Sequence, residues 1–197
     1  MSTALFGGTF DPVHSAHLDI ARQAADRFGL TKVLFVPAAN PPHKTGSAMA
    51  PYADRVRMLE LACAGDARFE VSRIEAPPSG PVSGDAVRSY SIHTIEKLKA
   101  AGFDPLSFLI GADAFAEIRT WHRWEDVVAS VGFIVVTRPG AVYETPPGAT
   151  VHELTGIESP VSSSLVRARI PGGCEVPVPD TVSAYIRRHG LYQSQTA

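Results

Sequence analysis

The stretch of residues 5–18 constrains the fold of this chain more than any other part of the sequence. It is a short apolar run that meets a glycine pair, turns at Asp11-Pro12 and carries two histidines three residues apart, His14 and His17. Apolar residues then recur at helical spacing through residues 15–28. This order predicts a strand, a glycine loop and a helix start. Loop amides with a helix N-terminus behind them bind anions, so we expect a phosphate cradle with both histidines at the first helical turn.

Short apolar runs and amphipathic segments alternate through the rest of the chain. The first strand, helix and second strand fit within roughly 35 residues, which is the size of one βαβ unit. We expect strands at 3–6, 32–36, 69–71, 106–110, 132–137 and 150–154, and helices at 15–28, 52–64, 89–101, 114–118, 121–128, 161–167 and 180–189. At least five strands alternating with helices predict an α/β fold with a doubly wound parallel sheet. We expect a single domain over residues 1–197, with residues 161–192 as a C-terminal helical subregion.

Polar residues gather where the expected strands end. In doubly wound sheets, ligands bind outside the carboxyl ends of the strands. Residues 7–17, 40–44 and 111–113 and Arg138 each follow such an end, while residues 73–88 are rich in Pro, Gly and Ser and predict a surface loop. Four polar clusters that arrive independently at one edge of the sheet therefore predict a ligand site there.

Several residues of these loops have two interpretations. Lys44 follows two prolines, and it either supplies a positive charge to a phosphate or is a solvated surface lysine. Asn40 either binds a ligand or satisfies its own turn. Asp113 either holds a ribose hydroxyl or a metal-bound phosphate, or caps the short helix that follows it. We expect Trp124 in the core, and one of the pair Trp121 and Trp124 can stack on an aromatic ligand ring.

The two phosphate signals also have alternatives. The stretch 7–17, which we interpret as a phosphate cradle, would instead be a helix capped by Asp11 with two surface histidines, or a metal site in which His14 and His17 share an ion with His43 or Asp113. The second signal is the serine run 162–164 followed by Arg167. Hydroxyls and amides at a helix N-terminus, with an arginine one turn later, bind a polyphosphate, but the same pattern also suits a serine-capped helix with a surface arginine.

Missing patterns exclude several classes of protein. The sequence has neither a Walker-type Gly-x-x-x-x-Gly-Lys-Ser/Thr motif nor a Gly-x-Gly-x-x-Gly fingerprint, and no nucleophile stands in a recognisable context. A site rich in phosphate binders suits direct transfer between two bound substrates, in which the protein positions reactants and neutralises charge.

A net charge of -2 gives no nucleic-acid footprint. Two distant cysteines, no signal peptide and no long apolar run predict a cytoplasmic protein away from the membrane. The oligomeric state stays open, a homo-oligomer included.

The residues named above resemble a known family. Residues 7–18 are similar to the signature of the nucleotidyltransferase superfamily with the His-x-Gly-His motif, and residues 161–167 resemble its second motif, Ile-Ser-Ser-Thr-x-Ile-Arg. Further stretches narrow the resemblance to the bacterial nicotinate-nucleotide adenylyltransferases. They are residues 41–44, 89–91, 110–113, 121–124 and 185–192. The resemblance covers nearly the whole chain in the right order and implies a Rossmann-like nucleotidyltransferase fold.

The resemblance also implies a reaction in NAD biosynthesis. ATP and nicotinate mononucleotide would give deamido-NAD and pyrophosphate, with Mg²⁺ as the cofactor. The implied catalytic residues are His14, His17, Lys44 and Arg167. The implied ATP-binding residues are Gly7, Gly8, Thr9, Phe10, Asp113, Arg138, Ser162 and Ser163. The implied nicotinate-nucleotide side is Asn40, Ser91 and Trp121, with Trp121 stacking on the pyridine and backbone amides meeting the carboxylate.

Three positions depart from the family pattern. Ala16 replaces the glycine between the two histidines, and its methyl group either crowds the approach of phosphate or is absorbed by a small backbone shift. Ser91 and Ser164 replace threonines and keep the hydroxyl. Two rival hypotheses remain. The first is a sibling adenylyltransferase that uses nicotinamide mononucleotide or phosphopantetheine, and the second is a sensor that binds nucleotides without catalysis.

Overall fold

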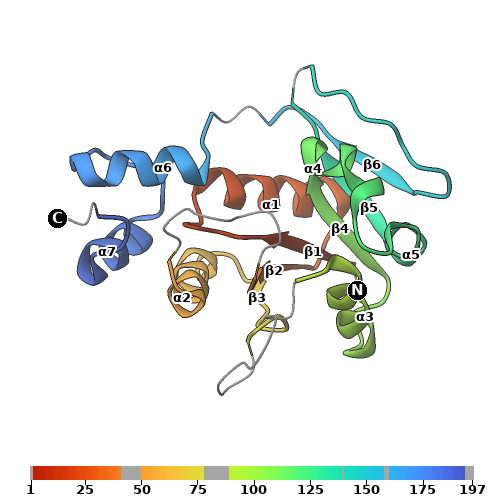
Figure 1. Ribbon diagram of the computed structural model, residues 1–197, viewed down its shortest axis with the longest axis horizontal. Coiled ribbons are helices and arrows are strands. Elements are labelled where there is room, and N and C mark those ends of the chain that lie inside the picture. Colours follow the sequence, from red (N-terminus) through yellow and green to blue (C-terminus); the bar gives the residue numbers. More distant parts are fainter. Residues whose placement is uncertain (1, 41–49, 78–88, 139, 158–159, 194–197) are drawn as a thin grey trace.

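A computed structural model describes residues 2–40, 50–77, 89–138, 140–157 and 160–193 of the chain. Six parallel strands form one sheet in the order β3-β2-β1-β4-β5-β6, with helices on both faces (Figure 1). The expected doubly wound parallel sheet is therefore confirmed. The strands are β1 (Thr3–Gly8), β2 (Lys32–Pro37), β3 (Phe69–Val71), β4 (Leu106–Gly111), β5 (Gly132–Val136) and β6 (Val151–Leu154). No helix of the described residues is long and apolar enough to cross a membrane.

Strand β1 lies at the point where the strand order reverses. It pairs with β2 on one side and with β4 on the other, so the crevice between its neighbours opens at the carboxyl end of β1. We expected this strand to end at Phe6, but it continues through Gly7 and Gly8, which pair with Val36 and Pro37 of β2. The glycine at position 8 has a steric reason, since a Cβ there would lie 3.0 Å from the Phe10 ring.

The helices cover the sheet in two layers. The side chains of α1 (Ser15–Phe28), α2 (Tyr52–Cys63) and α7 (Asp180–His189) share one core cluster with one face of the sheet. Those of α3 (Ser91–Ala100), α4 (Ala112–Ala116) and α5 (Trp124–Ser130) form the second cluster on the other face. Successive side chains of a strand point to opposite faces, so Leu5 and Phe6 of β1 belong to different clusters.

Some helix boundaries differ from those expected. Helix α4 begins at Ala112, which places Asp113 inside its first turn, so the alternative in which Asp113 caps this helix is wrong. A short 3-10 turn, η1 (Ile118–Thr120), follows, and Trp121 has extended backbone before α5 begins at Trp124. Trp124 is half-buried rather than fully buried. The left-handed conformation of Arg123, with φ 53°, is what separates Trp121 from the helix.

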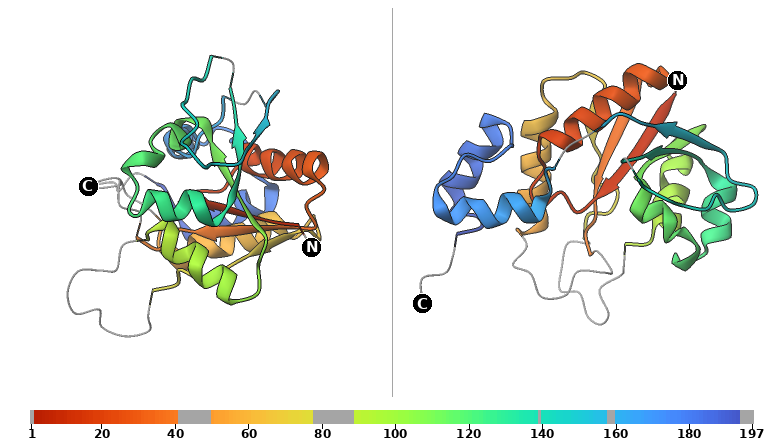
Figure 2. Two further views of the ribbon diagram at one scale, coloured as in Figure 1. Left: turned by 90° about the vertical axis from the view of Figure 1, so that its right-hand side faces the viewer. Right: turned by 90° about the horizontal axis from the view of Figure 1, so that it is seen from above.

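The C-terminal part of the chain forms helices α6 (Ser163–Arg169) and α7, with a 3-10 turn, η2 (Ile170–Gly172), after α6. Figures 1 and 2 show α6 and α7 together at one end of the sheet. Helix α7 packs on α2, where the Tyr185 hydroxyl donates to Asp54 Oδ1 over 2.7 Å. The C-terminal helices therefore reach the region beside the carboxyl end of β1, although they are last in the sequence.

Candidate active site

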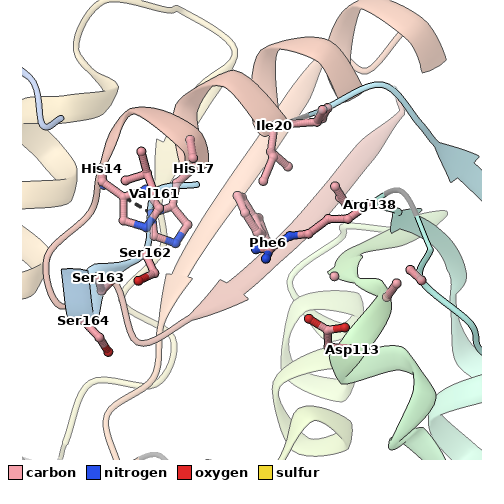
Figure 3. A pocket seen from close by; sticks show the side chains of 16 residues that line it. Phe6, His14, His17, Ile20, Asp113, Arg138, Val161, Ser162, Ser163 and Ser164 are labelled. Carbon is pink, nitrogen blue, oxygen red and sulfur yellow. Dashed lines mark hydrogen bonds between the residues drawn. The ribbon is translucent and has the colours of Figure 1, made fainter. Parts of the chain in front are cut away.

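A pocket of about 350 Å³ opens at the carboxyl ends of β4 and β5, beside the start of α1 (Figure 3). Its walls come from segments that are far apart in sequence. Among the residues that line it are Phe6, His14, Ala16, His17, Asp113, Arg138, Ser162, Ser163 and Ser164. The polar clusters after β1, β4 and β5 therefore do converge on one site, and the N-terminus of α6 joins them.

The two histidines lie against each other at the start of α1. His14 is the residue before the first helical turn, and its ring centroid is 3.7 Å from that of His17. The His14 backbone N–H donates to Nδ1 of His17 over 3.2 Å. A ring nitrogen that accepts a hydrogen bond carries no proton, so neutral His17 has its proton on Nε2. The backbone of the loop thus makes His17 a hydrogen-bond donor through Nε2–H.

His14 is almost completely buried, with 5% of its surface exposed. Burial lowers the pKa of its imidazole from the ordinary 6.5 to about 4, because a charged ring loses its hydration there. Its Nδ1 has no hydrogen-bond partner among the described residues. His14 is therefore a neutral hydrogen-bonding group at pH 7, and the hypothesis of two exposed surface histidines is wrong.

The same alternative also expected Asp11 to cap α1, which is wrong because the N-cap residue is His14. Asp11 has no exposed surface, and its Oδ1 accepts from the backbone N–H of Ala50 (3.0 Å) and from the Tyr192 hydroxyl (2.6 Å). The described residues contain no group of three or more His, Cys, Asp or Glu side chains that could hold a metal ion. His43, one of the two further ligands considered, lies outside the described residues.

Asp113 and Arg138 lie across the pocket from the histidines (Figure 3). Asp113 projects from the first turn of α4, directly after β4, and Arg138 follows β5. Both side chains are exposed. The pocket thus has histidines and a helix N-terminus on one side and an acid and a guanidinium on the other. A pocket with these two sides can bind a polar molecule that carries both phosphate and hydroxyl groups.

The serine run begins α6 as expected. Ser162 is the N-cap residue, and its hydroxyl accepts from the Leu165 backbone N–H over 3.2 Å. The Ser163 hydroxyl donates to the Pro12 carbonyl over 3.0 Å, so it holds the histidine loop. The Arg167 guanidinium donates to the Asp11 carbonyl (2.6 Å) and to Ser164 Oγ (3.3 Å) and is not among the residues lining the pocket.

Residues expected on the second-substrate side lie elsewhere. Asn40, Ser91 and Trp121 do not line the pocket of Figure 3. Trp121 is half-buried, with its ring centroid 5.9 Å from that of Phe108, whose ring lies over Gly7. The backbone of Asn40 is bonded to Ser89, two residues before Ser91. Lys44 lies outside the described residues.

Of the remaining glycine-loop residues, Gly8 lies against the ring of Phe10. Phe10 is 2% exposed, and its ring meets His17 edge-on at 5.0 Å between centroids. The Phe10 side chain therefore supports the His17 imidazole from behind. The Thr9 carbonyl accepts a hydrogen bond from the Arg55 guanidinium, as described next.

Arg55 is a residue whose importance the sequence did not indicate. Its place off the apolar stripe of α2 predicts an exposed side chain, yet it is 2% exposed. It donates to the carbonyls of Thr9 (2.8 Å), Ala38 (2.9 Å) and Ala50 (3.2 Å). These acceptors belong to three separate segments, so helical periodicity carries no signal of them.

Comparisons with known proteins agree with this arrangement. Residues 5–169 match the model of the cytidylyltransferase-like family. A probable nicotinate-nucleotide adenylyltransferase of Solibacter usitatus is 57% identical over 195 residues, covering 98% of this chain and 100% of that protein. One of Geobacillus thermodenitrificans is 39% identical over 98% of this chain and 87% of its own length.

Solved structures show the same fold at lower identity. The Plasmodium falciparum nicotinic acid mononucleotide adenylyltransferase, in complex with NaAD, has a TM-score of 0.74 at 14% identity and is covered over 97% of both chains. A putative nicotinate-nucleotide adenylyltransferase of Vibrio parahaemolyticus has a TM-score of 0.68 at 18% identity, over 99% of this chain and 98% of its own. With the full-length relatives and the family model, they confirm the resemblance seen in the motifs. The chain belongs to the nicotinate-nucleotide adenylyltransferases, a family of nucleotidyltransferases.

Proposed function

We propose that this enzyme transfers the adenylyl group of ATP to nicotinate mononucleotide, giving deamido-NAD and pyrophosphate. The observation that carries the proposal is the adjacent pair His14 and His17 at the N-terminus of α1, in a pocket that also contains Asp113, Arg138 and the start of α6. A donor pair beside a helix N-terminus suits a polyphosphate. The names of the relatives indicate nicotinate mononucleotide as the acceptor.

The chemistry needs little more than positioning and charge neutralisation. A phosphate oxygen of the acceptor attacks the α-phosphorus of ATP, one P–O bond forms, and the bond to pyrophosphate breaks. His17 would donate its Nε2–H to a non-bridging oxygen on which negative charge grows, because Nδ1 is engaged by the backbone. Neutral His14 would add a second hydrogen bond without adding a charge.

The remaining groups would hold the two substrates. Arg138 and the amides at the start of α6 would meet the phosphates of ATP, and Asp113 would accept from a ribose hydroxyl. Asn40, Ser91 and Trp121 would bind the nicotinate nucleotide on the far side of the β1 glycines, with Lys44 adding charge. Arg167 would act from beside the histidine loop, since its guanidinium is bonded to Asp11.

Mg²⁺ would reach this site on the triphosphate. In nucleotide sites this ion is usually held by substrate phosphates, water and one or two carboxylates rather than by a full protein cage. That preference fits the described residues, which contain no group of three or more side chains that could hold the ion by themselves. When bound, the ion neutralises charge on the phosphate oxygens.

We further propose that the enzyme acts as a single catalytic domain in the cytoplasm, without nucleic acid. The support is the net charge of -2 and the absence of a membrane-spanning helix among the described residues. Both cysteines are free, Cys63 buried and Cys174 exposed, which suits a reducing compartment.

Pyrophosphate release from ATP and Mg²⁺ tests the substrate assignment. The acceptors are nicotinate mononucleotide, nicotinamide mononucleotide and phosphopantetheine, each assayed with the wild type and with His17→Ala as the inactive control. We expect the highest kcat/KM with nicotinate mononucleotide. Turnover with nicotinamide mononucleotide and with no other acceptor would show that the assignment of nicotinate mononucleotide is wrong. ATP binding without pyrophosphate release for any acceptor would point to a sensor.

A further inference from the structure

The C-terminal part of the chain holds the loop that carries the catalytic histidines. Three contacts from residues 163–177 reach this loop: Ser163 Oγ donates to the Pro12 carbonyl, Arg167 donates to the Asp11 carbonyl, and the Ser15 N–H donates to the Pro177 carbonyl over 2.9 Å. All three involve loop backbone that precedes or begins α1. A fourth contact comes from the end of the described chain, where the Tyr192 hydroxyl reaches the Asp11 side chain.

The Asp11 carboxylate joins three segments. Its Oδ1 accepts from Tyr192 over 2.6 Å and from the Ala50 N–H over 3.0 Å, while Arg167 Nη1 lies 3.6 Å from Oδ2. Asp11 is completely buried, so none of these partners can be replaced by bulk water. On the other side of Ala50, its carbonyl accepts from the buried Arg55. Asp11 and Arg55 thus hold both backbone polar groups of Ala50.

The backbone at both ends of the Tyr192 contact is unusual. Tyr192 has φ 61° and Phe10, directly before Asp11, has φ 49°, both in the left-handed region that bulky residues rarely adopt. Such conformations persist only where surrounding contacts compensate for the strain, and they cluster at functional sites. Tyr192 packs against the main core cluster, and Phe10 supports the His17 ring. The two residues with left-handed backbone therefore orient the Tyr192 hydroxyl and the loop that carries the histidines.

We infer that Tyr192 is a positioning residue for the adenylyl transfer: through its hydrogen bond to Asp11 it fixes the loop that places His14 and His17. The inference rests on the proposed function for its kinetic consequence. Asp11 lies three residues before His14, and a small displacement of catalytic groups is enough to reduce a rate strongly. Burial and the neighbouring carboxylate raise the pKa of the Tyr192 phenol, so its hydroxyl remains a donor throughout the working pH range.

The chain provides a matched control for this inference. Tyr185 also donates a hydrogen bond from the C-terminal region to an aspartate, over 2.7 Å to Asp54, but this aspartate lies in the first turn of α2 and not in the histidine loop. Both tyrosines are half-buried. Tyr192→Phe and Tyr185→Phe therefore each delete one hydroxyl bonded to a carboxylate. Because Asp11 is completely buried and Asp54 is half-buried, the two changes differ in their cost to stability, but a merely structural role predicts an unchanged kcat of the folded fraction for both variants.

The experiment compares the two variants in steady-state kinetics and in hydrogen exchange. For Tyr192→Phe we expect kcat about fivefold or more below that of Tyr185→Phe, with the KM for ATP within about twofold of the wild type, since the lost interaction orients catalytic groups rather than substrate. We also expect faster exchange in peptides that cover residues 11–17. Equal kcat values for the two variants would overturn the inference.

The hydrogen-exchange measurement is independent of the substrate assignment. If the wild type shows no turnover with nicotinate mononucleotide, the proposed function fails, but exchange still tests whether Tyr192 orders the loop. If the wild type is active and residues 11–17 exchange equally in both variants, the positioning role of Tyr192 is wrong while the proposed function stands. As a second variant, Asp11→Asn keeps the shape of the side chain but removes its charge. We expect it to lower kcat at least as much as Tyr192→Phe, and a kcat equal to that of Tyr185→Phe would again contradict the inference.

Discussion

Replacing Arg55 by methionine tests whether the buried guanidinium holds together the three backbone segments that it joins. Methionine keeps the unbranched stem of the side chain and removes all its donors, so the change isolates the polar contacts. In the native protein these contacts bind the carbonyls of Thr9, Ala38 and Ala50, at the end of the glycine loop and on either side of residues 39–49.

The expected loss of stability follows from the burial of the three acceptors. A buried polar group left without its partner costs about 1–3 kcal/mol. The bond to Ala50 is buried, so its full cost applies, whereas the bonds to Thr9 and Ala38 are part-buried and water can restore some of the loss. The Asp11 carboxylate also loses a neighbouring positive charge. Together these effects predict a decrease of about 3–5 kcal/mol in the free energy of unfolding.

Urea unfolding followed by circular dichroism measures this free energy by linear extrapolation. Arg57→Met is the matched control, because Arg57 lies on the same helix, has 54% of its side chain exposed and pairs with Glu60 at the surface. A surface pair of this kind contributes about 1 kcal/mol or less. If Arg55→Met lowers the free energy of unfolding by no more than Arg57→Met does, the structural role derived for Arg55 is wrong.

Two further predictions concern the histidines. His17→Ala should lower kcat by roughly 10²-fold or more in a folded enzyme, because it removes a transition-state hydrogen bond; near-wild-type kcat would exclude that role. The folded pKa of His14 is about 4, against 6.5 ordinarily, so the unfolded chain binds this proton more readily. Its contribution to stability is therefore complete above about pH 6.5 and is lost as the pH falls towards 4, up to about 3 kcal/mol. In urea unfolding, the wild type should therefore lose free energy of unfolding relative to His14→Gln as the pH falls over that range. A constant difference between the two proteins would contradict the lowered pKa of His14.

Periodicity and local turn chemistry were enough to predict most of the fold. The apolar runs predicted all six strands, and the strand–helix alternation predicted the parallel arrangement, because parallel strands need a crossover connection that is usually a helix. The last pair differs, since no helix lies between β5 and β6 in the described residues. The helices expected at 15–28 and 180–189 end where predicted, because the glycines that follow them, Gly29 and Gly190, adopt the left-handed cap conformation. The errors lie at element boundaries. Pairing with β2 continues β1 through Gly7 and Gly8, and the left-handed backbone of Arg123 leaves Trp121 outside α5.

For the site, the sequence indicated residue types and the structure decided their partners. A glycine loop before a helix marks an anion site by itself, since the amides and the helix N-terminus are local features. The convergence of Asp113, Arg138 and Ser162 on that loop was expected only in part, from the rule for strand ends. Whether His14 is charged could not be read from sequence, because its pKa depends on burial by other segments.

The sequence by itself therefore determined the sheet, the phosphate-binding loop and, through its motifs, the family. Only the tertiary structure decided how that loop is held. Asp11 reads as a turn residue, Arg55 lies off the apolar stripe of its helix and Tyr192 is the last residue of the expected C-terminal helical subregion, yet all three meet in one hydrogen-bonded network. Their bonds join residues up to 181 positions apart in the chain. A contact of that kind has no local pattern, because its free energy comes from burial that exists only when the chain is folded.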